Sequence, residues 1–228
     1  MTAAPRSEAE LLQRAQDLAG KTLSQLAQEL NLQLPATATR GKGWIGQAVE
    51  QFLGATAGSQ AEPDFQYLGI ELKTIPVDAG PRAKESTFVT MVPHTTALET
   101  IWQDSSVYHK LRRVLWVPVE AGTDIAFAGR RIGSGFLWSP DAAQEKILRS
   151  DWEELMELVG FGEFDKLSAS IGQYLQIRPK AANAASAVRI MDHTAETTQT
   201  LPRGFYLRPT LTNELLQTNR QTDNATND

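Results

Sequence analysis

One short segment, Gly69–Val77 (GIELKTIPV), limits the folds open to this chain, because its alternation is typical of a strand in a folded core. Side chains of a strand point to its two faces in turn. One face therefore takes Ile70, Leu72 and Thr74, and the other takes Gly69, Glu71, Lys73 and Ile75. An acid and a lysine stand side by side on an otherwise apolar strand, which packing alone does not require.

Helix and strand signals are intermixed along the rest of the chain. Capping boxes at Ser7 (S-x-x-E) and Thr22 (T-x-x-Q) predict two short helices, and Gly54 is expected to end a third that begins at Trp44. Strands are expected at Leu68–Val77, Thr87–Val92, Val114–Val117, Ile125–Phe127, Arg131–Trp138, Tyr174–Ile177 and Gly204–Leu207. Further helices are expected from Asp141 to about Val159, over Phe164–Ile171 and over Ala181–Ile190. This order predicts an α/β or α+β domain with helices packed on a mixed sheet. We expect Pro118 to end its strand or to place it at a sheet edge.

Composition narrows the classes of partner and compartment. The chain has 228 residues, a formal net charge of −5 and no cysteine, which excludes disulfides and thiolate metal sites. A nucleic-acid partner would have to meet a local basic face. The sequence contains neither a signal-peptide pattern nor a long apolar run, so a cytoplasmic protein without a membrane span is expected. Zinc-type histidine spacing, a Walker loop and a nucleophile elbow are also absent from the sequence.

Asp64 stands seven positions before Glu71, which gives the pattern Asp64-x6-Glu71-x-Lys73. Two converging carboxylates can hold a hard divalent cation such as Mg²⁺. A lysine on the same face can orient a metal-activated water or offset charge in the transition state, so the set suits phosphodiester hydrolysis. By itself the pattern is weak, because an exposed strand edge with a modest ion pair gives the same spacing.

Longer blocks make the chain resemble the MutH family of mismatch-repair endonucleases. The blocks follow the family's order from about residue 7 to residue 217: KGWIGQAVEQFLGATAGS (Lys42–Ser59), DFQYLGIELKTIPVD (Asp64–Asp78), HKLRRVLWVPVE (His109–Glu120), LWSPDAAQ with DWEELM (Leu137–Met156), YLQIRPKAANA (Tyr174–Ala184) and LPRGFYLRP (Leu201–Pro209). The resemblance implies a restriction-endonuclease-like fold, with a central mixed sheet flanked by helices and a DNA-binding cleft between two lobes. We expect a single domain over residues 1–217 and a disordered polar tail over residues 218–228.

The resemblance also assigns catalytic roles. Asp64, Glu71 and Lys73 match the family's triad of acid, acid and lysine, and Glu50 matches a further carboxylate near the metals. One or two Mg²⁺ ions would be held by Asp64, Glu71 and Glu50, with the backbone carbonyl of Leu72 as an additional ligand. Lys110, in the HKLRR block, is implied to lie near the active site. Without the resemblance, Glu50 would be read as a solvated helix residue. The basic run HKLRR, which includes Arg112 and Arg113, is expected either to contact phosphates or to form an exposed basic face.

DNA contacts are implied for two further blocks. The RPK segment, Arg178, Pro179 and Lys180, matches the loop that reads the GATC bases, and arginine can bind guanine bidentately. Tyr206 matches a tyrosine that senses adenine methylation, although a half-buried core aromatic is the plain alternative. A phosphate contact is expected from Lys42, which precedes a helix start, and Arg203 and Arg208 are expected to be phosphate contacts or plain surface.

The resemblance implies a monomeric enzyme that nicks the unmethylated strand of hemimethylated GATC sites. It implies activation by MutL after MutS has found a mismatch. A stand-alone GATC restriction-type enzyme and a catalytically silent DNA-binding module remain open as alternatives. The regions near Pro93–Ser105 and Ala185–Leu201 resemble the family least, so DNA or partner contacts there are open.

Overall fold

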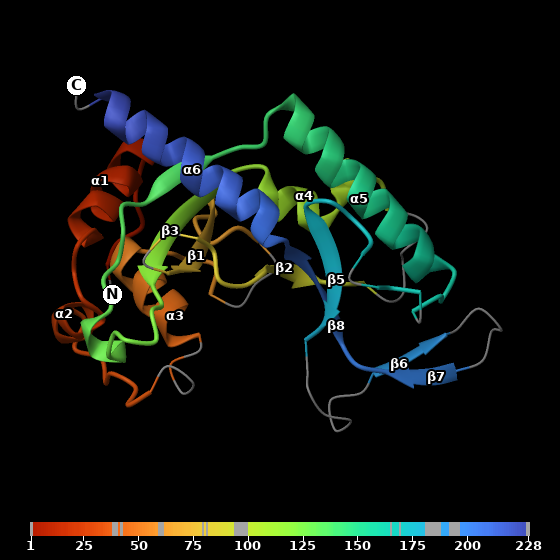
Figure 1. Cartoon of the computed structure of the whole chain (residues 1–228), viewed down its shortest axis with the longest axis horizontal. Helices are drawn as coiled ribbons and strands as arrows, with labels where there is room; N and C mark the ends of the chain where they lie inside the picture. The colour runs from red at the N-terminus through yellow and green to blue at the C-terminus, as the bar shows by residue number, and fades with distance from the viewer. Residues whose placement is uncertain are drawn as a thin grey trace. The chain divides into compact units, whose positions relative to one another are not determined.

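The structure is a computed structural model that describes residues 2–37, 41, 43–58, 62–78, 80, 82–93, 100–164, 166–168, 170–180, 188–191 and 197–226. The chain divides into two compact units, each built from segments that are distant in sequence. Unit 1 comprises Met1–Glu85, Arg112–Ser139 and Asn213–Asp228, and unit 2 comprises Ser86–Leu111 and Pro140–Thr212. None of the described helices is long and apolar enough to cross a membrane. Figure 1 shows the course of the chain.

Unit 1 is an α/β unit with a mixed sheet. Its helices are α1 (Glu8–Leu18), α2 (Leu23–Glu29) and α3 (Trp44–Leu53), followed later in the chain by the short 3-10 helix η2 (Phe127–Gly129). Its strands are β1 (Glu71–Val77), β3 (Val114–Glu120) and β4 (Phe136–Trp138). The sheet order is β1-β3-β4, with β1 parallel and β4 antiparallel to β3. The predicted mixed sheet flanked by helices is confirmed here.

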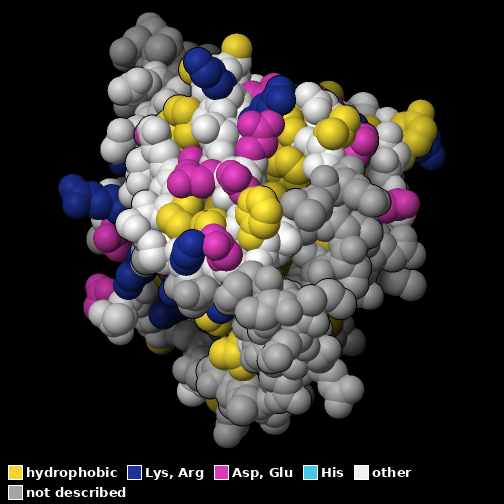
Figure 2. All heavy atoms as spheres, turned by 90° about the vertical axis from the view of Figure 1, so that its right-hand side faces the viewer, with side chains coloured by type: hydrophobic (Ala, Val, Ile, Leu, Met, Phe, Trp, Pro, Cys, Tyr) yellow, Lys and Arg dark blue, Asp and Glu magenta, His cyan; other side chains and the backbone are white. Residues whose placement is uncertain are grey.

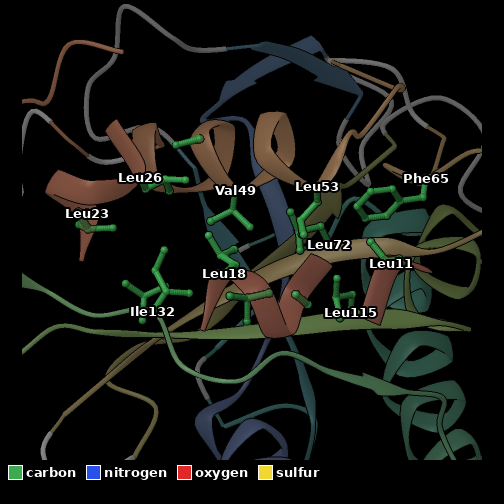
Figure 3. Close-up of a cluster of buried hydrophobic side chains, with 14 of the residues drawn as sticks. Leu11, Leu18, Leu23, Leu26, Val49, Leu53, Phe65, Leu72, Leu115 and Ile132 are labelled. Atoms are coloured by element: carbon green, nitrogen blue, oxygen red, sulfur yellow. The ribbon is translucent and has the colours of Figure 1, made fainter. Parts of the chain in front are cut away.

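The core of unit 1 lies between the three N-terminal helices and this sheet, as Figure 3 shows. Leu11 and Leu18 of α1 and Val49 and Leu53 of α3 are fully buried. Leu72 of β1 packs into the same cluster. Because Leu72 lies between Glu71 and Lys73, its burial fixes the part of β1 that carries both charged residues.

Local signals start and stop the helices as the sequence predicts. Ser7 accepts a hydrogen bond from the Glu10 backbone N–H, and Thr22 forms a complete capping box. Asp141 caps α5 (Ala142–Gly160) in the same way. Gly54 ends α3 with a φ of 84°. A cap supplies a partner to backbone N–H groups that the helix itself leaves free, which is why these boundaries are readable from sequence.

Unit 2 is built on an antiparallel sheet with the order β2-β8-β5. Its strands are β2 (Thr87–Met91), β5 (Leu175–Pro179), β8 (Arg203–Leu207) and the separate hairpin of β6 (Val188–Met191) and β7 (Thr197–Thr200). Its helices are η1 (Trp102–Asp104), α4 (Ser106–Leu111) and α5. The last helix, α6 (Pro209–Thr226), begins in unit 2 and passes the boundary between the units after Thr212. This second sheet was not expected from the sequence, because strand pairing is not a local property.

Pro118 does not end β3 or place it at an edge, so that prediction is wrong. The strand continues to Glu120, and β3 is the central strand of its sheet. Arg113 O and Ala121 N both bond to β1, so the odd-numbered residues along β3 point their backbone groups toward β1. The backbone groups of the even-numbered Pro118 therefore point away from β1. There β4 pairs only with Val114–Trp116, and Gly133 N donates to Pro118 O. The N–H that proline lacks is therefore not needed for the β1–β3 pairing.

Other boundaries also differ from the predictions. The strand predicted from Leu68 begins only at Glu71, and the strand predicted over Ile125–Phe127 is replaced by a turn and η2. No helix is found among the described residues of Phe164–Ile171. Of the helix predicted over Ala181–Ile190, residues 181–187 lie outside the described part and Val188–Ile190 belong to β6. Residues 218–226, which we expected to be disordered, continue α6.

Candidate active site

Asp64, Glu71 and Lys73 come together at the start of β1. The Lys73 ammonium lies 2.7 Å from Glu71 Oε1, and both side chains are largely buried, with exposed fractions of 13% and 4%. Asp64 Oδ2 accepts a hydrogen bond of 2.8 Å from the backbone N–H of Leu72. That bond links Asp64, which precedes β1, to Leu72, which lies between Glu71 and Lys73 on the strand. The predicted grouping of acid, acid and lysine is therefore present in unit 1.

The environment of Asp64 raises the pKa of its carboxyl to about 6. Burial is the largest cause, and the negative charge of Glu71 is the next. The hydrogen bond from Leu72 N and the charge of Lys73 lower the pKa, while Glu50 adds a further small repulsion. Burial and the charge of Glu71 thus make ionisation of the Asp64 carboxyl unfavourable in the metal-free site. A cation bound at the two acids would offset both effects.

The donor chemistry fits a divalent metal, because carboxylate oxygens are the ligands that hard cations prefer. Asp64 and Glu71 are the two acids brought together, and Glu50 of α3 is half-buried and near enough to act on the pKa of Asp64. Among the described residues, however, no three acidic or histidine side chains form a group that would hold a metal by themselves. The roles of Glu50 and of the Leu72 carbonyl as ligands stay predictions.

Two further lysines were predicted to act on the DNA, Lys110 near the acids and Lys42 at a phosphate. Lys110 is buried on α4, with an exposed fraction of 8%, and belongs to unit 2. Its role near the acid pair stays a prediction. Lys42 lies outside the described residues.

The predicted base-reading residues gather on the sheet of unit 2. Arg178, Pro179 and Lys180 are exposed at the end of β5, which pairs with β8. The Arg178 guanidinium carbon lies 5.8 Å from the centre of the Tyr206 ring. The Lys180 ammonium lies 3.9 Å from the centre of the Phe88 ring, and the Phe88 and Tyr206 rings meet edge to face at 5.4 Å. Two cations and two aromatic rings thus form one surface.

Comparison with known proteins decides the family. The family model described as "DNA mismatch repair enzyme MutH" matches residues 53–151. Proteins named "DNA mismatch repair protein MutH" from Vibrio campbellii, Serratia proteamaculans and Escherichia coli K12 are each 49% identical over 212 residues. These alignments cover 93% of this chain and 93–94% of each relative. This chain belongs to the MutH family. The α/β class and the mixed sheet of unit 1 agree with the restriction-endonuclease-like fold that this family implies.

Phe88 belongs to the cationic and aromatic surface of unit 2, and the sequence did not point to it. Its ring lies over Gly204, where an added Cβ would come within 2.7 Å of Phe88 Cε2. Gly204 therefore leaves the space that the Phe88 ring occupies. The alternation of Thr87–Met91 predicts a strand, but the pairing of Phe88 with Tyr206 depends on β2–β8 register. No short-range signal in one sequence gives that register.

Arg203 and Arg208, for which phosphate contacts were considered, make contacts within the protein itself. The Arg208 guanidinium donates a hydrogen bond to Ile171 O, and the Arg208 backbone N–H donates one to Tyr174 O. The Arg203 guanidinium carbon lies 5.7 Å from the Phe164 ring centre, and burial lowers the pKa of Arg203. These contacts order the segments on either side of β5 and β8. DNA contact by either arginine stays a prediction.

Proposed function

We propose that this chain nicks the unmethylated strand of hemimethylated GATC sites by Mg²⁺-dependent hydrolysis of a phosphodiester bond. Membership of the MutH family makes it a DNA endonuclease of mismatch repair, a hydrolase that acts on phosphodiester bonds. The site residues, the GATC sequence, Mg²⁺ as the metal, and strand choice are the proposed refinements. The observation that carries the hydrolytic part of the proposal is the buried group of Asp64, Glu71 and Lys73, while GATC recognition and strand choice rest on the family resemblance.

Each residue of the group has a proposed part. Asp64 and Glu71 would hold the divalent cation, with Glu50 and the Leu72 carbonyl as further candidates. A bound Mg²⁺ would supply polarisation of the phosphoryl oxygen and a lower pKa for an attacking water. Lys73, held 2.7 Å from Glu71, is placed to orient that water and to offset negative charge that grows on the phosphate. Hydrolysis joins the water oxygen to phosphorus and breaks one P–O ester bond. One proton of the water is released, and the departing sugar oxygen gains one to become a hydroxyl. We propose that Lys110 assists near the phosphate.

Recognition is assigned to the cationic and aromatic surface of unit 2. Arg178 and Lys180 would contact base edges of GATC, and Pro179 between them restricts the backbone. Tyr206, half-buried beneath Arg178, would report on the adenine methyl group. Lys42, Arg203 and Arg208 are the proposed phosphate contacts. A site built from a few cations explains how a chain of net charge −5 binds a polyanion. Figure 2 shows acidic and basic side chains mixed on the described part of one face.

The proposal includes partners and place of action. Activation by MutL, after MutS has located a mismatch, would follow from the chain's family, as would action as a monomer in the cytoplasm on double-stranded DNA. Neither alternative has a specific structural observation in its favour. A silent DNA-binding module would not need Asp64, Glu71 and Lys73 grouped and buried. A restriction-type enzyme would differ by cutting both strands without a partner.

A nicking assay tests the proposal directly. One duplex with a single GATC site is prepared unmethylated, hemimethylated and fully methylated, and is incubated with Mg²⁺ or EDTA, with and without MutL. We expect Mg²⁺-dependent cutting of unmethylated strands only, stimulated by MutL. Cutting of both strands without MutL would support the restriction-type alternative. Binding without cleavage under every condition would support the silent module.

A further inference from the structure

Tyr67 is the most exposed of the described large apolar or aromatic side chains, at 87%. It lies on the connection between Asp64 and Glu71, three residues after the first and four before the second. At the greatest extension of the chain, its Cα is about 11 Å from that of Asp64 and about 14 Å from that of Glu71. A single exposed aromatic is common on protein surfaces, so exposure alone assigns no role.

The connection holds Tyr67 in a fixed turn. Phe65 and Ile70 form an isolated antiparallel bridge, with hydrogen bonds of 2.9 and 3.3 Å in the two directions. Leu68 N donates to Phe65 O, and Gly69 N donates to Gln66 O. Gly69 has a φ of 65°, a conformation that most other residues avoid. The turn is therefore a closed, hydrogen-bonded loop with Tyr67 at its tip.

Arg112 supplies the second observation. Its guanidinium lies against this turn, because a Cβ added to Gly69 would be 3.1 Å from Arg112 Nη2. The Arg112 side chain is exposed, and none of the ion pairs among the described residues includes it. Its neighbour Arg113, by contrast, is paired with Glu8 at 2.6 Å. An exposed cation that has no carboxylate partner among the described residues thus lies at the base of the turn that presents Tyr67.

We propose that Tyr67 and Arg112 bind the DNA backbone beside the scissile phosphate, each through a phosphate oxygen. The inference rests on the proposed function, because it takes Asp64 and Glu71 to mark the scissile phosphate. Tyrosine hydroxyls and arginine guanidinium groups are regular partners of phosphate oxygens in protein–DNA complexes. The two residues position the strand and read no sequence. Beside two carboxylates that repel a phosphate, a cation and a hydroxyl offset the repulsion.

The test measures DNA binding and nicking separately for Tyr67→Phe, Tyr67→Ala and Arg112→Ala. Binding of a fluorescent hemimethylated GATC duplex is followed by anisotropy in EDTA, and nicking is followed at saturating protein with Mg²⁺. We expect each variant to bind about tenfold more weakly, the effect of losing one hydrogen bond to a charged group. Nicking at saturation should stay within about threefold of the wild-type rate, because the chemical groups are intact. Arg112→Ala should also lower the salt slope of binding by about 1.

Position along the strand is tested with single methylphosphonates, which remove the charge of one phosphate. Wild-type protein should lose affinity when the phosphate next to the scissile one is neutralised, and the Tyr67 and Arg112 variants should lose less, because each has already lost one contact. Phe161→Ala removes another exposed aromatic (55%) and Lys146→Ala another exposed cation, and both controls should bind as wild type.

Three outcomes would overturn the inference. The first is unchanged binding by Tyr67→Phe, which would exclude a hydroxyl–phosphate bond. The second is an equal loss in the Lys146→Ala control, which would show a general charge effect. The third is normal binding and nicking alone but lost stimulation by MutL, which would make the turn a protein contact. A wild-type protein that never nicks GATC DNA would instead contradict the proposed function.

Discussion

Lys73 is a single residue whose two possible roles can be separated. Its ammonium is 2.7 Å from Glu71 Oε1, so it neutralises a buried acid as well as lying at the candidate site. We predict that Lys73→Met, which keeps most of the aliphatic stem, lowers the nicking rate at saturation by about 10²-fold or more. DNA affinity should change by no more than about threefold, because a group needed only in the transition state adds little to ground-state binding.

Anisotropy and single-turnover nicking with the hemimethylated duplex check both parts. Lys146→Met on α5 is the matched control, since Lys146 is exposed and lies on another element. If Lys73→Met lost binding as strongly as nicking, Lys73 would be a DNA contact or a structural partner and not a catalytic group.

Asp64 carries a prediction about stability and pH. Its pKa is raised from 3.8 to about 6, so the folded state binds the proton more tightly than the unfolded state. Between about pH 4 and pH 6 the metal-free protein therefore becomes less stable as pH rises, and above pH 6 the full cost is present. We predict that Asp64→Asn, which mimics the protonated acid, stabilises the metal-free protein at pH 8 by up to about 3 kcal/mol.

Urea unfolding in EDTA at pH 4 and pH 8 measures this difference. At pH 4 the advantage of Asp64→Asn should be nearly gone, because the wild-type carboxyl is then protonated in the folded state. Asp104→Asn, which changes an exposed acid, should show no such pH dependence. A less stable Asp64→Asn at pH 8 would mean that the hydrogen bond from Leu72 N outweighs the burial of charge.

At the scale of elements, Asp151 joins α5 to the start of β5. Its buried carboxylate accepts hydrogen bonds from three consecutive backbone N–H groups, those of Gln173, Tyr174 and Leu175, at 2.7–2.9 Å. These bonds fix the strand that carries Arg178 and Lys180. We predict that Asp151→Ala lowers the free energy of unfolding by about 3 kcal/mol or more, because buried donors are left without partners.

Chemical denaturation with Glu154→Ala as the control tests this, since Glu154 is an exposed acid on the same helix. The control should stay within about 0.5 kcal/mol of wild type. Asp151→Asn should fall between the two, because an amide offers one acceptor oxygen. Equal stability of Asp151→Ala and Glu154→Ala would show that the β5 start is held by its pairing with β8 alone.

The elements that could be read from the sequence are those with local causes. Ser7, Thr22 and Asp141 mark helix starts by side chains that bond within their own first turn. The failures have non-local causes. Pro118 is tolerated in a central strand because it faces the β4 side, where pairing ends at Trp116. The β2-β8-β5 sheet joins strands that are distant in sequence.

In the candidate site, too, the residues that could be predicted are those close in sequence, and those that were missed depend on contacts between distant segments. Asp64, Glu71 and Lys73 are close in sequence, so their spacing and the alternation of one strand predicted that they would meet. Phe88 was missed, because its contact with Tyr206 crosses from β2 to β8. The hydrogen bond from Arg208 to Ile171 O could not be predicted from the sequence either, because a basic residue in a DNA-binding family is most simply assigned to a phosphate contact.

At the scale of the whole molecule, metal binding at the acid pair should appear as a change in global stability. A ligand that binds only the folded state stabilises it by RT ln(1 + [L]/Kd), about 1.4 kcal/mol at ten times Kd. For a chain of 228 residues this predicts a rise in Tm of about 3–6 °C at saturating Mg²⁺ and pH 8. The bound cation would offset the burial of charge and the repulsion by Glu71 that raise the Asp64 pKa, so Asp64→Asn should lose most of the rise. Scanning calorimetry with MgCl₂, and with KCl at equal ionic strength, separates binding from screening. An equal rise in KCl would show screening of charge without metal binding, and an undiminished rise in Asp64→Asn would place the metal elsewhere in the chain.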